Sequence, residues 1–368
     1  MDKFKIAHSD LKDAAEAVKS IKGQLADVDA CMILFFVSPT YPPDVIGREM
    51  AAAFAGIRTV GCTTAGEMIN NRMGANSIVA MAFCKSSMKF LQIEVLENIN
   101  ADTEDVAKAF KSFEKSLGEP MKTLDPMKYV GLVIIDGLSG CEEKLNDRLG
   151  NHTNVPFVGG SAGDNFEFKC TYMFVDGKVY SSNAAILALM EPTNGFKVLK
   201  TQSFSVTDKK IMPTKVDEER RMVIEFDGKP AAETYAEMFG ISLEEFEKNH
   251  QAYHVGVVLD ERHYFVRSPG NIVDGALTFF CSVKEGLELT ALQMEDIVSG
   301  TRADLQKCGE VKAIVDFCCG FRSLDLTNKN RLKEYSEIFG DVPTVGFATY
   351  GESYIGHMNM TSTMLLLK

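Results

Sequence analysis

The chain has 368 residues and carries 39 Lys and Arg against 51 Asp and Glu, a formal net charge of −12. This acidic balance lacks the basic surface that binding to nucleic acid or to an anionic membrane requires, so we expect neither kind of partner. At roughly 150 residues per domain the length predicts two domains, and a hydrophobic content of 45% excludes a wholly disordered chain.

Residues 1–20 lack the basic segment and apolar core of a secretory signal. No apolar run approaches the roughly 18 to 20 residues that span a bilayer. The nine cysteines include no CxxC pair, and most of them lie in apolar runs. We therefore expect a cytoplasmic protein whose cysteines are reduced thiols in the core.

In chain order, the sequence predicts an amphipathic helix over 10–29, a buried strand over 32–37 and a second helix over 44–55. The phrase IRTVGCTTAGEM (57–68) then predicts a strand, a glycine turn and an acid, Glu67. A further apolar strand is expected over 76–83.

The same order recurs twice further along the chain. The second copy predicts a strand over 130–136, a helix over 141–150, the phrase VPFVGGSAGDN (155–165), a hairpin at Asp176-Gly177 and a strand over 182–190. A separate amphipathic helix is expected over 101–117. The third copy predicts a strand over 311–317, a helix over 329–339, the phrase VPTVGFATYGES (342–353) and a strand over 361–368.

The repeated unit is a strand, a loop, a helix, a strand, a glycine turn and a strand. Continuous apolar runs predict strands buried on both faces, and the helices between them predict sheets covered by helices. The crossover favours parallel pairing of its two strands, while the last strand can return antiparallel. We predict an α/β or α+β fold of layered sheets with covering helices.

The charged segment 205–221 contains Pro213 and breaks the apolar periodicity, which favours a linker or an exposed loop. The predicted division is therefore an N-terminal domain over 1–204, the linker, and a C-terminal domain over 222–368. Copies one and two fall in the first domain and copy three in the second.

Glycine after a buried strand lets backbone N–H groups approach a ligand closely. Hydroxyl and acidic side chains of the three phrases, together with the adjacent glycine, predict a small-molecule pocket at the strand ends; they include Thr64, Gly160, Ser161, Asp164 and Glu352. The alternative is that these are tight turns chosen for their geometry, with acids that cap local backbone N–H groups.

Two arginines follow strands, Arg322 in FCCGFRS and Arg267 in HYFVRSP. Either arginine could hold a ligand carboxylate through a bidentate pair, and the alternative is an ion pair with a nearby acid. Tyr350, in the third phrase, could add an aromatic wall with a hydroxyl.

Catalytic motifs are almost absent, so we do not expect an enzyme. The segment Gly159-Gly160-Ser161-Ala162-Gly163 fits the G-x-S-x-G pattern of a nucleophile elbow. An elbow needs a helix after the serine, but the residues that follow predict a hairpin. His254 and His263 flank one predicted strand nine residues apart, a spacing that predicts no metal pair.

Six phrases together resemble the FIST family (F-box and intracellular signal transduction proteins), and they occur in the family's order. They are VGCTTAGEM (60–68), DGLSGCEE (136–143), VGGSAGDN (158–165), YFVRSP (264–269), FCCGFR (317–322) and GFATYGES (346–353). The resemblance covers the chain from about residue 30 to its end. The family's Cys-x-x-Arg corresponds to Cys319 and Arg322, and its Tyr-Gly-Glu to Tyr350, Gly351 and Glu352.

The resemblance implies a bacterial sensory protein that binds a small ligand such as an amino acid. Without an output domain, it would signal through a separate partner, such as a histidine kinase or a cyclic-dinucleotide enzyme. A first alternative implied by the family is a haem protein that senses nitric oxide and modulates a histidine kinase, with His254 or His263 as the only candidate ligands. A second alternative, from the elbow pattern, is a hydrolase that uses Ser161.

Overall fold

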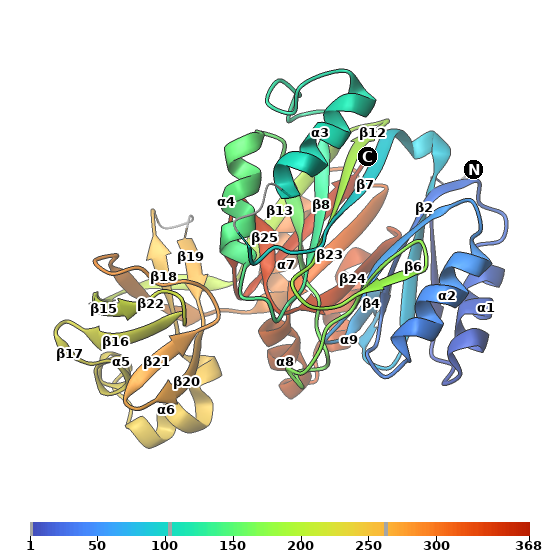
Figure 1. The fold of residues 1–368 in the computed structure, drawn as a ribbon. Helices are drawn as coiled ribbons and strands as arrows, with labels where there is room; N and C mark the ends of the chain where they lie inside the picture. The colour runs from blue at the N-terminus through green and yellow to red at the C-terminus, as the bar shows by residue number, and fades with distance from the viewer. Residues whose placement is uncertain (1–2, 102–104, 261–263) are drawn as a thin grey trace. The chain divides into compact units, whose positions relative to one another are not determined.

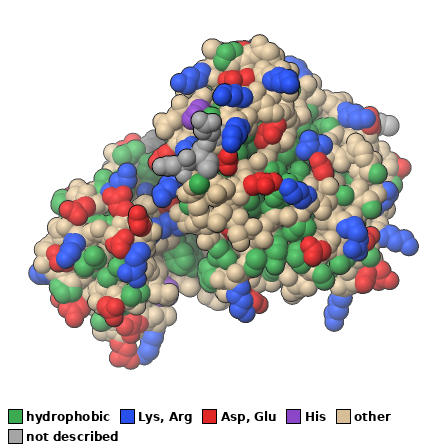
Figure 2. Space-filling view, in the orientation of Figure 1, with side chains coloured by type: hydrophobic (Ala, Val, Ile, Leu, Met, Phe, Trp, Pro, Cys, Tyr) green, Lys and Arg blue, Asp and Glu red, His purple; other side chains and the backbone are tan. Residues whose placement is uncertain are grey.

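The computed structural model describes residues 3–101, 105–260 and 264–368 (Figure 1). The chain divides into two compact units, of which the first contains residues 1–201, 302–356 and 362–368 and the second 202–301 and 357–361. The second unit is thus inserted into the sequence of the first. On the face shown in Figure 2, basic and acidic side chains are interspersed. None of the helices described has both the length and the hydrophobicity needed to cross a bilayer.

The first unit is built from three repeats with one element order: strand, helix, strand, helical segment, strand, hairpin and strand. The first repeat contains β1 (Phe4–Ser9), α1 (Ala14–Gln24), β2 (Ala30–Val37), α2 (Pro43–Ala53), β3 (Arg58–Thr63), β4 (Glu67–Ile69), β5 (Arg72–Gly74) and β6 (Ile78–Cys84). The second contains β7 (Met88–Leu96), α3 (Asp105–Leu117), β8 (Val130–Ile135), α4 (Glu142–His152), β9 (Phe157–Ser161), β10 (Met173–Val175), β11 (Lys178–Tyr180) and β12 (Ala185–Pro192).

The third repeat is interrupted by the second unit, which begins at the last residue of its first strand and ends within its first helix. It contains β13 (Phe196–Gln202), α7 (Ile297–Gln306), β23 (Ala313–Cys319), α8 (Gly320–Asn328), α9 (Leu332–Ser336), β24 (Thr344–Thr349), β25 (Glu352–Tyr354) and β27 (Thr361–Leu367). The three copies predicted from the sequence are confirmed. Each repeat also begins with a strand and a helix that precede the predicted unit of strand, loop, helix, strand, glycine turn and strand.

Each repeat forms its own sheet, and each sheet is completed by a strand or hairpin from the next repeat. Among the strands of the first unit, the orders are β1-β6-β2-β3-β10-β11, β7-β12-β8-β9-β25 and β13-β27-β23-β24-β4-β5. The pairs β2–β3, β8–β9 and β23–β24 are parallel, as predicted, and the last strand of each repeat returns antiparallel. The first sheet receives β10 and β11 from the second repeat, the second sheet receives β25 from the third repeat, and the third sheet receives β4 and β5 from the first repeat. The three sheets therefore form a closed ring.

The sheets are buried on both faces, which explains the continuous apolar runs. Along β2, Ile33 and Phe35 pack under α1 and α2, whereas Leu34 and Phe36 face a central core that all three sheets share. Phe36 contacts Phe347 of the third sheet with ring centroids 4.5 Å apart. The predicted α/β fold of layered sheets with covering helices is confirmed.

The Val-Gly pair in each phrase has a steric cause. A Cβ atom on Gly61, Gly159 or Gly346 would lie 2.3, 1.7 or 2.2 Å from a carbonyl oxygen of the neighbouring parallel strand. Only glycine lets the two strands approach this closely, so the recurrence of the pair reflects one backbone geometry used three times.

The second unit, yellow to orange in Figure 1, consists mainly of two antiparallel sheets and two helices. One sheet joins β14 (Phe204–Ile211), β22 (Leu289–Met294), β18 (His254–Val258) and β19 (Tyr264–Arg267). The other joins β15 (Pro213–Asp217), β16 (Met222–Phe226), β21 (Ala276–Phe279) and β20 (Pro269–Val273), and β17 (Lys229–Pro230) pairs with β16. The helices are α5 (Ala231–Phe239) and α6 (Leu243–Asn249), and β26 (His357–Met358) also belongs to this unit.

The two compact units divide the chain differently from the predicted domains. Residues 205–221 lie mostly in β14 and β15 rather than in a linker, and copy three belongs to the same unit as copies one and two. The segment lacks apolar periodicity because most side chains of these two strands are exposed or only partly buried. Copy three joins the first unit because its sheet shares strands with the other two repeats.

Candidate functional site

Three turns that follow parallel strands meet at one place in the first unit, which we call the turn junction. Turn one is 63–67, turn two 161–165 and turn three 348–352. Backbone bonds join each turn to the other two: Ala65 N to Ala348 O (3.0 Å), Gly163 N to Thr63 O (3.0 Å) and Ser161 N to Gly351 O (2.9 Å). The carboxyl ends of parallel strands, where ligands of α/β proteins commonly bind, therefore converge here.

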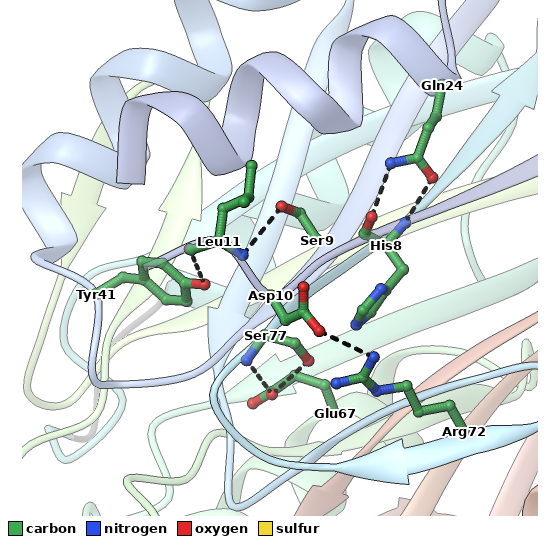
Figure 3. A network of polar contacts seen from close by, with 9 residues as sticks. All are labelled: His8, Ser9, Asp10, Leu11, Gln24, Tyr41, Glu67, Arg72 and Ser77. Atoms are coloured by element: carbon green, nitrogen blue, oxygen red, sulfur yellow. Dashed lines mark hydrogen bonds and ion pairs between the residues drawn. The ribbon is translucent and has the colours of Figure 1, made fainter. Parts of the chain in front are cut away.

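The acid of turn one is buried and bound within its own repeat (Figure 3). Thr64 Oγ1 donates to Glu67 Oε1 at 2.5 Å, and the Ser77 amide and hydroxyl both donate to Glu67 Oε2 at 2.9 Å. Burial raises the pKa of Glu67 to about 7, although these donors favour the charged form. Glu67 therefore holds its proton to a higher pH than an ordinary glutamic acid does.

A polar network next to Glu67 fastens the end of β1 to the β4–β5 hairpin (Figure 3). Arg72 Nη1 forms an ion pair with Asp10 Oδ2 at 3.1 Å, and both side chains are substantially exposed. The Arg72 hydrogen bond lowers the pKa of Asp10. Because both side chains are solvated, the ion pair adds little to stability, and we assign it the role of holding the β4–β5 hairpin in position.

The acid of turn two organises the loop that follows it. Asp164 accepts the amides of Phe168 (2.9 Å), Lys169 (2.6 Å) and Cys170 (2.9 Å), and it also accepts the Tyr350 hydroxyl. Burial opposes the charged form, but the Tyr350 and backbone donors outweigh it and lower the pKa of Asp164. The carboxylate therefore stays ionised at neutral pH.

An aromatic group lies over this loop. The Phe168 ring stacks on Tyr350 at 4.8 Å with an interplanar angle of 21°, and Phe166 lies 5.9 Å from Tyr350. Phe168 is 50% exposed, while Asn165, Phe166 and Phe168 all have positive φ values of 53 to 63°. Consecutive left-handed residues are strained, and such strain concentrates at functional sites.

The acid of turn three is fully buried. Thr349 Oγ1 donates to Glu352 Oε1 at 2.8 Å, which repeats the Thr64–Glu67 bond of turn one. Ser161 Oγ, at turn two, donates to Glu142 Oε1 at 3.3 Å, at the start of α4. These bonds fit the alternative in which the acids stabilise tight turns.

Arg322 and Cys319 lie behind turn three, where β23 ends and α8 begins. Arg322 is completely buried, and its guanidinium carbon lies 5.9 Å from the centre of the Tyr335 ring. Tyr335 donates its hydroxyl to Asp316 Oδ2 at 3.0 Å. Burial raises the pKa of Asp316 to about 6, although Arg322 and two hydroxyl donors act in the opposite direction.

The sequence-predicted residues are therefore only partly brought together. Five of them lie in the turn junction, Thr64, Ser161, Asp164, Tyr350 and Glu352, and Gly160 lies next to it in β9, paired with Glu352. Arg267 lies instead in the second unit, where Nε donates to Ser282 O at 2.8 Å. Sequence reasoning missed Phe166, Phe168 and Glu142, and the only signal for the first two was their spacing in FEF directly after the Asp164 phrase.

Ser161 has the strand but not the helix of a nucleophile elbow. β9 ends at Ser161, and the next regular element is the strand β10. The side chain is buried and bonded to Glu142. An elbow uses the helix that directly follows its serine to stabilise an oxyanion, and no helix lies between Ser161 and β10.

Of the two histidines considered for haem, His254 lies in the second unit and His263 lies outside the described residues. His254 is fully buried, and its Nδ1 lies 3.2 Å from Ser268 Oγ. Burial lowers the pKa of His254 to about 4, so the ring is neutral. Its Nε2 has no hydrogen-bond partner among the described residues. A neutral imidazole with an unbonded nitrogen has the donor chemistry that haem iron accepts.

The fold and the site define an α/β repeat protein in which three glycine turns share one junction. Profiles of the FIST N domain and the FIST C domain match residues 31–229 and 231–354, respectively. The chain therefore belongs to the FIST family, whose domains are small-ligand sensory domains of signal transduction. The boundary between the two profiles falls inside the second compact unit.

One relative is an uncharacterised protein of Methanocaldococcus jannaschii. It is 24% identical over 239 residues, which are 62% of this chain and 44% of that protein. The chain thus spans less than half the length of this relative.

Proposed function

We propose that the chain is a cytoplasmic small-ligand sensor of bacterial signal transduction that acts through a separate partner, either a histidine kinase or a cyclic-dinucleotide enzyme. The observation that carries the proposal is the half-exposed Phe168 ring stacked on Tyr350 over a strained loop at the turn junction. Family membership supports the sensory role.

The ligand would lie on the faces of Phe168 and Tyr350. An ammonium group is attracted to aromatic faces, and the ionised Asp164 beneath Tyr350 adds negative charge. Asp164 already accepts four donors, which fills its two oxygens, so it would attract the ligand without bonding it directly. These features favour an amino acid or another small amine.

The other predicted residues support the turns in this proposal. Thr64, Gly160, Ser161 and Glu352 fix the junction, and Arg322 with Cys319 forms the buried layer behind turn three. We assign Arg267 no role at the junction.

Signalling would follow from ligand-dependent changes in turns two and three. Turn two is bonded to α4 through Ser161 and Glu142, and β25 is bonded to α4 through Ser353 and Asn146 at 3.2 Å. A ligand that favours one arrangement of the turns would thereby favour one position of α4. The ligand can change the affinity for the partner by no more than the difference between its own binding free energies for the two arrangements of the turns.

The test is a thermal-shift screen of amino acids and small amines, followed by calorimetric titration of the tightest binder. Phe168→Ala is expected to weaken binding at least tenfold, about 1.4 kcal/mol, because it removes the stacking surface. Leu259→Ala, at an exposed position (69%) in the second unit, is the control and should bind like the wild type. Equal affinity of Phe168→Ala and wild type would contradict the site.

A haem-based nitric oxide sensor is the second candidate, and the buried Nε2 of His254 favours it. In that case, protein purified from haem-supplied cells should show a Soret band that shifts with nitric oxide, and His254→Ala should lose it. A colourless protein that does not take up added haem would exclude this candidate.

A further inference from the structure

Two of the three hairpins are fastened by a polar residue that follows their first strand. Asp176, after β10, accepts the Thr59 amide at 2.9 Å and Arg58 Nε at 2.7 Å. Asn70, after β4, accepts the Thr344 amide at 2.7 Å, and its amide nitrogen donates to carbonyl oxygens before that strand. In both cases a side-chain oxygen binds an N–H at the start of the adjacent strand, and we call this contact the clip.

The third hairpin has no clip. The strand registers align Val175 with Val60, Ile69 with Val345 and Tyr354 with Val158. The residue equivalent to Asp176 and Asn70 is therefore Ile355, and the residue equivalent to Thr59 and Thr344 is Phe157. An isoleucine side chain has no acceptor, so it cannot bind the Phe157 amide.

Ile355 is also exceptional in its own conformation. Its φ is 63°, in the left-handed region that β-branched residues rarely adopt, and its side chain is 81% exposed. The equivalent Asp176 has a similar φ of 49°, so the hairpin turn imposes this conformation, and only the use of an exposed β-branched residue there lacks a reason in the fold. An exposed, strained apolar residue at the one position where the repeat pattern breaks points to a role in binding.

A cavity of about 600 Å³ opens beside this position, within the first unit. It lies between α4, the start of β9, β13 and the turn after β25, and Leu149, Phe157, Phe196 and Val198 supply much of its apolar lining. The volume is that of a typical small-molecule site. Of the described residues that line it, Lys197 alone is charged, and none is an acid.

We propose that this cavity binds a small monocarboxylate with an apolar body about the size of one ring. The carboxylate would take the place of the missing clip oxygen at the Phe157 amide, and Lys197, which lines the same cavity, would supply the opposite charge. Lys197 Nζ already donates to Cys308 O at 2.8 Å, which leaves further ammonium protons for an anion. A zwitterion is disfavoured because no lining acid would pair with its ammonium group.

This site differs from the turn junction in position and in charge preference. The junction proposal calls for a cation on aromatic faces, whereas this cavity calls for an anion. The two can therefore fail separately, and Phe168→Ala is expected to leave binding in the cavity unchanged.

The test is calorimetric titration of the full chain with 3-phenylpropanoate, with 3-phenylpropanol as the neutral control. We expect the carboxylate to bind at least about tenfold more tightly than the alcohol and Lys197→Met to lose most of this preference. Equal affinity for the two probes, or no binding of either, would overturn the proposal.

The decisive variant is Ile355→Asp, which installs the clip of the second repeat. It is expected to raise the melting temperature, because the new carboxylate can bind the Phe157 amide. It is also expected to weaken 3-phenylpropanoate binding at least about tenfold, because the new carboxylate occupies the place proposed for the carboxylate of the ligand. Ile355→Gly is the matched control, since it relieves the positive φ without adding an acceptor and should bind like the wild type. Unchanged affinity in Ile355→Asp would show that the clip position is not the carboxylate subsite.

Discussion

Gly159→Ala is expected to lower the free energy of unfolding by about 3 kcal/mol, because the added methyl group would make the closest contact found for any of the glycines described. The added Cβ would lie 1.7 Å from the Val133 carbonyl oxygen, so β9 must move away from β8. Urea denaturation followed by circular dichroism measures the loss.

Gly74→Ala provides the control for this experiment. Gly74 also lies in a strand, but no atom lies within 4 Å of an added Cβ. We expect its effect to stay within about 0.5 kcal/mol. A loss below about 1 kcal/mol for Gly159→Ala would contradict the parallel register of β8 and β9.

Glu67 is expected to make the protein less stable as the pH rises. Its folded-state pKa of about 7 lies above the ordinary value of 4.5, so between these values the folded state holds a proton that the unfolded state has released. Stability is therefore lost progressively from pH 4.5 to 7 and is constant above that range. The pKa difference corresponds to about 3 kcal/mol.

Glu67→Gln isolates this effect from the other titrating groups. His254 acts in the opposite direction, because its lowered pKa adds stability as the pH rises from about 4 to 6.5. The measured quantity is the difference in unfolding free energy between wild type and Glu67→Gln at pH 5 and pH 8. We expect the unfolding free energy of the wild type, relative to that of Glu67→Gln, to fall by about 2 to 3 kcal/mol between pH 5 and pH 8. A difference that does not depend on pH would contradict a raised pKa of Glu67.

Much of the first unit could be predicted from the sequence, because its repeats use one geometry. The Val-Gly pairs recur since each glycine makes the same close approach to a parallel strand. Strands such as β2 are apolar throughout because both of their faces are covered. The first strand of each repeat was harder to find, since β7 and β13 are only partly buried and lack a continuous apolar run.

The exchange of hairpins could not be predicted. β4 and β5 have three residues each, and backbone pairing carries no information on which sheet such short strands will join. The Asp176-Gly177 turn was predicted from local preferences, and the structure forms a hairpin there. Its partner, the Thr59 amide, lies 117 residues away, and no local signal identifies a contact at that distance.

For the site, the sequence identified the residues of the turns but not what they contact. Glu67, Asp164 and Glu352 were recognised as acids beside glycines, yet their partners are hydroxyls and amides supplied by folding. The aromatic pair depends on Phe168 meeting Tyr350 from another repeat. Such a contact exists only after the three sheets close into a ring.

The turn junction is proposed to receive the ligand that the sensor detects. A crystal structure of the full chain soaked with the tightest-binding amine of the screen tests it most directly. We expect the ligand to contact the faces of Phe168 and Tyr350. A ligand bound without contact to either ring, or no bound ligand at a saturating concentration, would contradict it.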